Sequence, residues 1–190
     1  MSSQGDSQPS QDSTATLMDE DRHEVIYFAY GSNLSTEQML RRCPSSVPVG
    51  LGYLSGWRWI INERGYANIV RADDDDDDDD DSQSEVYGLL YLLPPDDEAA
   101  LDGYEGVPQA YKKYKIDLLR VRDERGRDLP DEQRVTALVY VDDVRKGASV
   151  PREEYVKRME VGIEEAVEDW GMGEEYAEEL RGWLRGETQA

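Results

Sequence analysis

Short runs of β-branched, aromatic and other apolar residues, separated by turn residues or charges, recur between residues 24 and 141. Such runs are typical of β-strands. Gly126 and Pro130 are expected to mark the turn between the last two runs. The pattern predicts strands at residues 24–30, 47–54, 57–62, 66–71, 85–93, 111–121 and 135–141.

Helical signals are fewer and lie mostly toward the C-terminus. Ser35, followed three residues later by Gln38, resembles a capping box that opens a short helix. Residues 96–104 follow two prolines and begin with acidic side chains, which favours a second short helix. Pro151 opens a longer amphipathic pattern, and two nearby glycines separate it from a last helix at 174–185.

Strands first and helices last, without regular βαβ alternation, predict an α+β fold. We expect a small, mostly antiparallel β-barrel or sheet with flanking helices. Residues 23–186 are expected to form a single domain. Residues 1–22 and 73–84 hold almost nothing to bury, so they are expected to be a disordered tail and a disordered insertion, with a second short tail at 187–190.

The formal net charge of −22 is concentrated in part in one run of nine aspartates, Asp73 to Asp81. Nucleic-acid binding needs clustered Lys and Arg, so the composition argues against it, and anionic membrane surfaces are disfavoured for the same reason. No apolar run approaches the roughly 18 to 20 residues needed to cross a bilayer. The N-terminus lacks a signal-peptide pattern, so a soluble, cytoplasmic protein is expected.

Histidine and cysteine are each present once, as His23 and Cys43. A single cysteine allows no intrachain disulfide, in keeping with a reducing compartment. A Ser-His-Asp triad, a Cys-His pair or a multi-histidine metal site would have to use His23, which borders a polar tail. No metal site is therefore expected, and His23 is expected to do no chemistry.

Residues 27–34 (YFAYGSNL) end a predicted buried strand and turn into the first helix. The turn would expose backbone N–H groups beside a helix N-terminus, where they can bind a carboxylate or a developing oxyanion. An ordinary strand-to-helix turn has the same features and stays the alternative from the residues alone. A covalent role for Ser32 is not expected, because no suitable histidine base is available.

Glu105 lies between a predicted helix and a Gly-Val-Pro loop. A carboxylate held at such a junction can face a cavity and gain a raised pKa, as a general acid or base requires. In a chain with 43 acidic residues, a surface or capping role is the stronger alternative on spacing alone.

Together these segments resemble the γ-glutamylcyclotransferase family. The resemblance covers about residues 25–186 and follows the family's order, with YFAYGSNL at 27–34, EVYGLLYLL at 85–93, LDGYEGVP at 101–108, TALVYVDD at 136–143 and EEYVKRM at 153–159. The YGSNL form is more similar to enzymes acting on γ-glutamyl amino acids than to the branches specific for glutathione or γ-glutamyl-ε-lysine. The implied fold is a small α+β barrel with flanking helices.

The resemblance implies a general acid/base at Glu105. It implies substrate-binding roles for Tyr27, Phe28, Ala29, Tyr30, Gly31, Ser32, Asn33, Tyr140 and Tyr155. The implied reaction cyclises a small γ-glutamyl substrate to 5-oxoproline and releases an amino acid. Because the substrate's own α-amine attacks the γ-carbonyl, this chemistry needs no enzyme nucleophile, metal or cofactor.

Two alternatives stay open. One is a cyclotransferase specific for glutathione or a γ-glutamylamine. The other is a non-catalytic acidic protein whose Asp73 to Asp81 run binds basic partners or weakly collects divalent cations. The oligomeric state also stays open, a homodimer included.

Overall fold

The computed structural model describes residues 24–72 and 84–187. The predicted N-terminal tail, His23 and the Asp73 to Asp81 run lie outside the described residues.

A closed barrel of five strands forms the centre of the described structure. Its strands follow the order β1, β5, β2, β6, β7, and β7 closes the barrel against β1. The β1–β7 pair is parallel and the other pairs are antiparallel. The predicted mostly antiparallel α+β barrel is therefore confirmed. The strands span β1 Val25–Ala29, β2 Val47–Ser55, β5 Glu85–Leu93, β6 Lys112–Arg122 and β7 Asp128–Val141.

A separate two-stranded antiparallel sheet is formed by β3 (Trp57–Ile61) and β4 (Ala67–Arg71). Trp59 in β3 is fully buried and donates its indole N–H to the carbonyl of Tyr30, 2.9 Å away. Its ring packs edge to face against Trp183, with ring centroids 6.1 Å apart. These contacts fix the hairpin between the end of β1 and the C-terminal helices.

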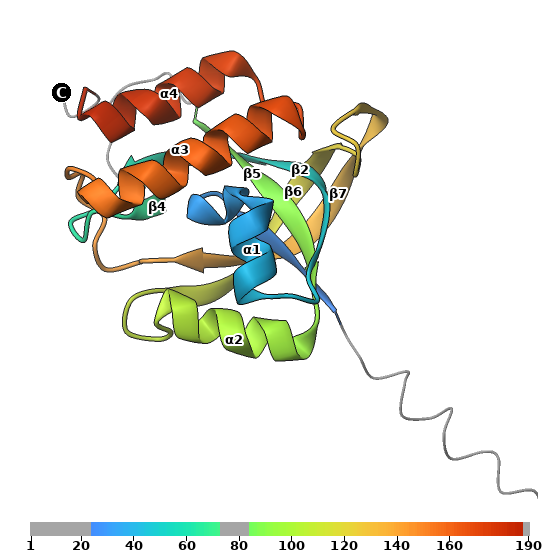
Figure 1. The fold of residues 1–190 in the computed structure, drawn as a ribbon, viewed down its shortest axis with the longest axis horizontal. Coiled ribbons are helices and arrows are strands. Elements are labelled where there is room, and N and C mark those ends of the chain that lie inside the picture. The colour runs from blue at the N-terminus through green and yellow to red at the C-terminus, as the bar shows by residue number, and fades with distance from the viewer. Residues whose placement is uncertain (1–23, 73–83, 188–190) are drawn as a thin grey trace, which may run out of the picture.

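Four α-helices flank the barrel in the described structure, while the side on which β6 and β7 project carries no helix (Figure 1). They are α1 (Thr36–Arg42), α2 (Pro95–Glu105), α3 (Glu153–Glu168) and α4 (Glu174–Arg185). Figure 1 shows α3 and α4 side by side on one side of the molecule, α2 toward the opposite side, and α1 between them. The predicted amphipathic pattern of α3 is confirmed, since the buried side chains recur every three or four positions at Tyr155, Met159, Ile163 and Ala166.

The β6–β7 connection differs from the prediction. Gly126 does lie in the turn, with a φ of +70° that favours glycine. Pro130, however, lies within β7, which begins at Asp128. The pairing register shifts between Arg120 and Arg122 of β6, opposite this part of β7. Proline has no backbone N–H to donate to a neighbouring strand. It is therefore tolerated where the pairing is irregular, and the strand continues past it.

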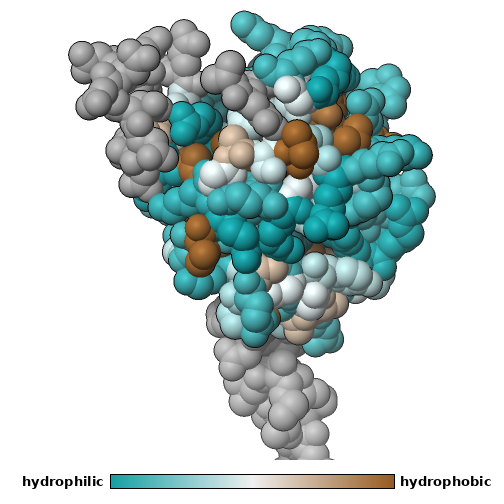
Figure 2. Space-filling model, turned by 90° about the vertical axis from the view of Figure 1, so that its left-hand side faces the viewer, coloured by the Kyte–Doolittle hydropathy of each residue, from teal (hydrophilic) through white to brown (hydrophobic). Residues whose placement is uncertain are grey.

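The surface seen in Figure 2 is mainly hydrophilic. Apolar side chains on this face are scattered among polar ones and do not form a continuous patch. Isolated exposed apolar residues are normal for a folded domain and indicate no particular partner.

Candidate active site

A cavity of about 220 Å³ opens where the end of β1, the β3–β4 turn, the end of α2 and the start of α3 meet. Its volume is below the roughly 300–1,000 Å³ of pockets for drug-sized ligands, so it suits a small molecule. Glu105 lines it. So do seven of the nine residues expected to bind substrate, namely Tyr27, Tyr30, Gly31, Ser32, Asn33, Tyr140 and Tyr155.

Phe28 and Ala29, the other two, are fully buried and are not among the lining residues. Phe28 packs instead against the ring of Tyr30, with centroids 6.2 Å apart. A substrate-binding role for these two residues stays a prediction.

The turn after β1 is a single 3₁₀ turn, η1 (Ser32–Leu34), which stands between the strand and α1. The N–H of Leu34 donates to the carbonyl of Gly31 (2.9 Å), and that of Ser35 to the carbonyl of Ser32 (3.2 Å). The amides of Ser32 and Asn33 precede these bonds, and the first N–H groups of a helical turn have no acceptor within it. Both residues line the cavity, and the N–H of Ser32 bonds the Tyr155 hydroxyl there.

Gln38 makes the backbone contact that the predicted capping box requires, and its side chain makes two further contacts that were not predicted. Its backbone N–H donates to the side chain of Ser35 (3.3 Å), as predicted. Its side-chain amide donates to Ser32 Oγ and to Asn33 Oδ1, both at 2.9 Å. Gln38 therefore fixes the turn from behind, a contact that helix-capping patterns alone do not reveal.

Asn33 is the centre of the hydrogen-bond network. Its Nδ2 donates to the hydroxyl of Tyr27 (3.0 Å) and to Glu105 Oε1 (3.2 Å). Its Oδ1 accepts from Arg42 (3.0 Å) as well as from Gln38. Donors surround the oxygen and acceptors surround the nitrogen, so the orientation of this amide is fixed and presents an N–H to the Glu105 carboxylate.

Glu105 is the last residue of α2, directly before Gly106 in the left-handed conformation. Part of its surface stays exposed, yet the surrounding protein desolvates the carboxylate, and this burial raises its pKa. Arg42 and the Asn33 hydrogen bond oppose the shift because they stabilise the ionised form. The predicted helix-to-loop junction is confirmed, and it does place Glu105 at a cavity.

Tyrosines supply much of the cavity lining. Tyr155 touches the turn closely, because a Cβ added at Gly31 would lie 2.9 Å from its hydroxyl. Tyr140 donates to Asp102 Oδ1 (2.7 Å), and its carbonyl accepts from Tyr30 (2.5 Å). Burial raises the pKa above the ordinary tyrosine value at Tyr27, Tyr30, Tyr111, Tyr140 and Tyr155.

Sequence reasoning missed six lining residues that carry charge or aromatic surface. They are Arg42, Arg64, Tyr66, Tyr104, Tyr111 and Arg158. Arg158 follows Tyr155 by three positions, so helical spacing from a predicted site residue was a usable signal. Arg64 had no such signal, because it lies in the turn between two predicted strands.

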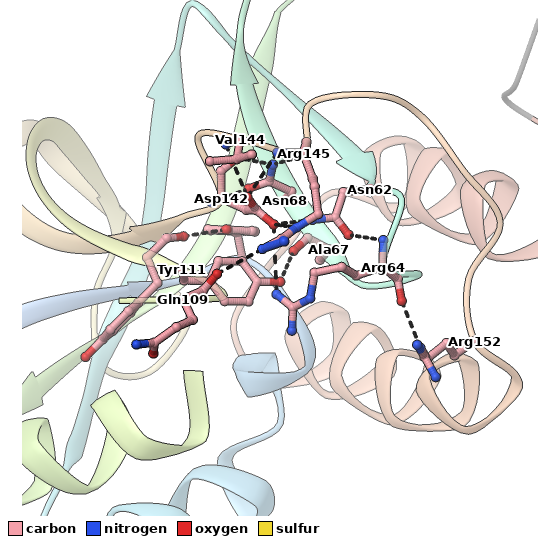
Figure 3. Close-up of polar contacts among 12 residues, drawn as sticks. Asn62, Arg64, Ala67, Asn68, Gln109, Tyr111, Asp142, Val144, Arg145 and Arg152 are labelled. Atoms are coloured by element: carbon pink, nitrogen blue, oxygen red, sulfur yellow. Dashed lines mark hydrogen bonds and ion pairs between the residues drawn. The ribbon is translucent and has the colours of Figure 1, made fainter. Parts of the chain in front are cut away.

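A buried carboxylate anchors the β3–β4 hairpin beside the cavity (Figure 3). Asp142 is 2% exposed and accepts from Asn62 (3.1 Å) and from Arg145 (2.7 Å). Its backbone N–H donates to Asn68 Oδ1 (2.9 Å). Figure 3 shows Arg64 extending from the same hairpin toward Tyr111. The network therefore fixes the turn that carries Arg64 against the end of β7.

Within residues 24–72 and 84–187, no group of three or more His, Cys, Asp or Glu side chains could hold a metal ion. In the same part of the chain, every helix is too short or too polar to cross a membrane.

The closed barrel holds a cavity that is lined by tyrosines and arginines around one carboxylate, an arrangement suited to binding a small polar molecule. The family described as gamma-glutamyl cyclotransferase, AIG2-like, matches residues 27–157, and the chain belongs to this family. The match spans both the turn after β1 and Glu105. Membership indicates a cyclotransferase-type function. No curated protein sequence matches the chain significantly.

Solved structures share the fold. The human protein called uncharacterized protein loc79017 superposes with a TM-score of 0.66 at 22% identity, over 84% of this chain and 88% of that one. A structure named gamma-glutamyl cyclotransferase gives 0.66 at 23% identity, over 85% and 88%. YkqA from Bacillus subtilis gives 0.64 at 18% identity, over 90% of this chain and 57% of that one. At these identities the likeness concerns the fold alone.

Proposed function

We propose that this protein is a γ-glutamylcyclotransferase that converts γ-glutamyl amino acids to 5-oxoproline and a free amino acid, with Glu105 as the general acid/base. The observation that carries the proposal is the Glu105 carboxylate, which lies in the cavity, 3.2 Å from the Asn33 amide. Family membership supports the reaction type.

The reaction needs a curled substrate. One C–N bond forms between the substrate's α-nitrogen and its γ-carbon, while the C–N bond to the leaving amine breaks. Both reacting groups belong to one molecule, so a cavity that holds the chain folded supplies the advantage of an intramolecular attack. A volume of about 220 Å³ favours a compact conformation over an extended one.

Glu105 moves the proton. In its ionised form it accepts a proton from the substrate's α-ammonium, which frees the attacking lone pair, and it later gives a proton to the departing amine. A carboxylate with an ordinary pKa is a weak base at neutral pH, and burial raises the pKa of Glu105 toward the working range. The Asn33 N–H keeps the carboxylate oriented without taking its proton.

The turn residues bind charge on the substrate. Ser32 and Asn33 line the cavity, and the backbone N–H of Asn33 can donate to the α-carboxylate or to the oxyanion that forms at the γ-carbonyl, whereas the backbone N–H of Ser32 already bonds the Tyr155 hydroxyl. Arg42, which already holds Asn33, adds positive charge beside them. These groups bind the glutamyl end next to Glu105, where its ammonium must lie.

The test is product formation from γ-glutamyl-alanine, followed by mass spectrometry for 5-oxoproline and alanine. The wild type is expected to form both, and Glu105→Gln to lose at least about 100-fold in kcat, within the range of general acid–base catalysis. Glu160→Gln, which removes an exposed carboxylate on α3, is the matched control and should keep full activity. A folded Glu105→Gln with undiminished turnover would remove the role assigned to Glu105.

A further inference from the structure

The described lining of the cavity carries more positive than negative charge. Arg42, Arg64 and Arg158 line it, whereas Glu105 is its single acidic residue among the residues described. A γ-glutamyl amino acid has one ammonium and two carboxylates, one on each half. The charge of the cavity therefore matches a substrate with two anionic groups better than one with a single anionic group.

Arg42 belongs to the glutamyl end of the site. It donates to Asn33 Oδ1 (3.0 Å), and its guanidinium lies 5.0 Å from the ring centre of Tyr104. The substrate's α-carboxylate and α-ammonium are bonded to the same carbon, and Glu105 takes its proton from that ammonium. That carboxylate must therefore lie beside Glu105, close to Arg42 and the turn amides.

Arg64 has unused donor capacity. Its Nη1 is buried and makes no hydrogen bond within the described residues. Nη1 forms a long ion pair with Asp142 Oδ2, 3.9 Å away, and this oxygen already accepts from Asn62 and Arg145. A buried guanidinium N–H without an acceptor is unfavourable, and an anionic ligand in the cavity would satisfy it.

The protein holds Arg64 in place and balances its charge only in part, through the long ion pair with Asp142. Its backbone N–H donates to Asn62 Oδ1 (3.1 Å), and its carbonyl accepts from Arg152 (2.8 Å). Its guanidinium lies 5.5 Å from the ring centre of Tyr66 and 5.2 Å from that of Tyr111, and both rings line the cavity. The position of the charge is thus set by the backbone and by two aromatic faces.

Arg158 lies on the same side. Its guanidinium is 5.2 Å from the ring centre of Tyr155, which packs edge to face on Tyr66 with centroids 5.1 Å apart. Arg158 donates to Ser32 Oγ (3.4 Å) and also pairs with Glu154 (2.9 Å), so part of its charge is already balanced. Arg64 is the stronger anion-binding group of the two.

We propose that Arg64, assisted by Arg158, binds the carboxylate of the leaving amino acid and thereby selects γ-glutamyl amino acids over γ-glutamylamines. This inference rests on the proposed function and adds the specificity of the leaving-group side of the same site. Arg64 contributes binding, whereas proton transfer stays with Glu105.

Two substrates isolate the proposed contact. γ-Glutamyl-alanine and γ-glutamyl-ethylamide differ only in the leaving-group carboxylate. The wild type is expected to show a kcat/KM about 10- to 100-fold higher for γ-glutamyl-alanine, the effect of a charge-assisted hydrogen bond. Arg64→Gln should lose about that factor with γ-glutamyl-alanine, chiefly through KM, and less than about threefold with the ethylamide.

Further variants keep the test decisive. Arg64→Lys, which keeps the charge, should recover part of the preference, and Arg158→Gln should lose a smaller part of it. Arg41→Gln, which changes an exposed arginine paired with Glu37 on α1, is the control and should leave the preference unchanged. If a thermal melt shows that Arg64→Gln is unfolded, the substrate preference of the wild type and its reduction in Arg158→Gln still test the proposal.

The outcomes separate the two proposals. Turnover of both substrates without preference, or equal losses with both in Arg64→Gln, would overturn the carboxylate subsite while leaving the cyclotransferase function standing. If neither γ-glutamyl-alanine nor γ-glutamyl-ethylamide yields 5-oxoproline, the function and the subsite are both overturned.

Discussion

Replacing Gly31 by alanine places a methyl group directly against Tyr155. The new Cβ would lie 2.9 Å from the Tyr155 hydroxyl and 3.3 Å from the Cβ of Ala67. The first distance is about half an ångström shorter than a comfortable contact between nonbonded heavy atoms. Both residues line the cavity, so the clash must displace part of the site.

The magnitude follows from the packing. Overfilling a well-packed site costs typically about 1–3 kcal/mol. For a domain of this size each kcal/mol shifts Tm by roughly 2–4 °C, so Gly31→Ala should lower Tm by about 2–12 °C. Because the turn or Tyr155 must move, kcat/KM for γ-glutamyl-alanine should fall at least about tenfold.

Differential scanning fluorimetry and the 5-oxoproline assay measure both effects. Gly103→Ala is the matched control, because a Cβ there meets nothing within 4 Å and lies in α2, so stability should rise by up to about 1 kcal/mol. Adding Tyr155→Phe to Gly31→Ala removes the clashing oxygen and should recover part of the lost Tm. A Gly31→Ala protein with unchanged Tm and turnover would refute the close packing of this turn.

Three further predictions concern pH, the hairpin network and the insertion. Burial raises the pKa of Glu105, so ionising it destabilises the fold. The wild type should therefore lose stability relative to Glu105→Gln as pH rises through that raised pKa. The free energies of unfolding of the two proteins, measured by urea denaturation, should differ least below about pH 4.3. A constant difference across pH would contradict this. Wild-type kcat/KM should fall as pH drops through the same pKa. Asp142→Asn should cost about 1–3 kcal/mol in urea denaturation and raise KM, because it loosens the hairpin that carries Arg64; unchanged values would contradict the anchoring role. A Gly/Ser linker in place of Asp73 to Asp81 should leave turnover intact, whereas loss of turnover with a folded protein would argue for a role of the run in activity.

Much of the fold was predictable because its determinants are local. The apolar runs of β1 and β5 and the helical spacing of α3 appear in the structure close to their predicted bounds. Pro130 was misplaced because a proline signals a turn in isolation, while a shift in the β6–β7 register can accommodate it within a strand. Such a shift depends on the partner strand and leaves no local mark in the sequence.

The site was predictable where a motif carried it. The turn at 30–33 and Glu105 come together in the cavity although they are far apart in the chain. The place of Arg64 in the cavity lining was not predictable, because it depends on how the β3–β4 hairpin packs and on its anchoring by the buried Asp142 through Asn62 and Asn68. Long-range pairing of this kind follows from tertiary structure and not from spacing.

The most direct test of the central claim follows oxygen during turnover of γ-glutamyl-alanine. In water enriched in oxygen-18, intramolecular cyclisation predicts 5-oxoproline and alanine, neither of which contains the heavy isotope. N-acetyl-γ-glutamyl-alanine, whose α-nitrogen cannot attack, should not be cleaved. Release of glutamate labelled with oxygen-18, or cleavage of the acetylated substrate, would show hydrolysis by water and would contradict the cyclotransferase account.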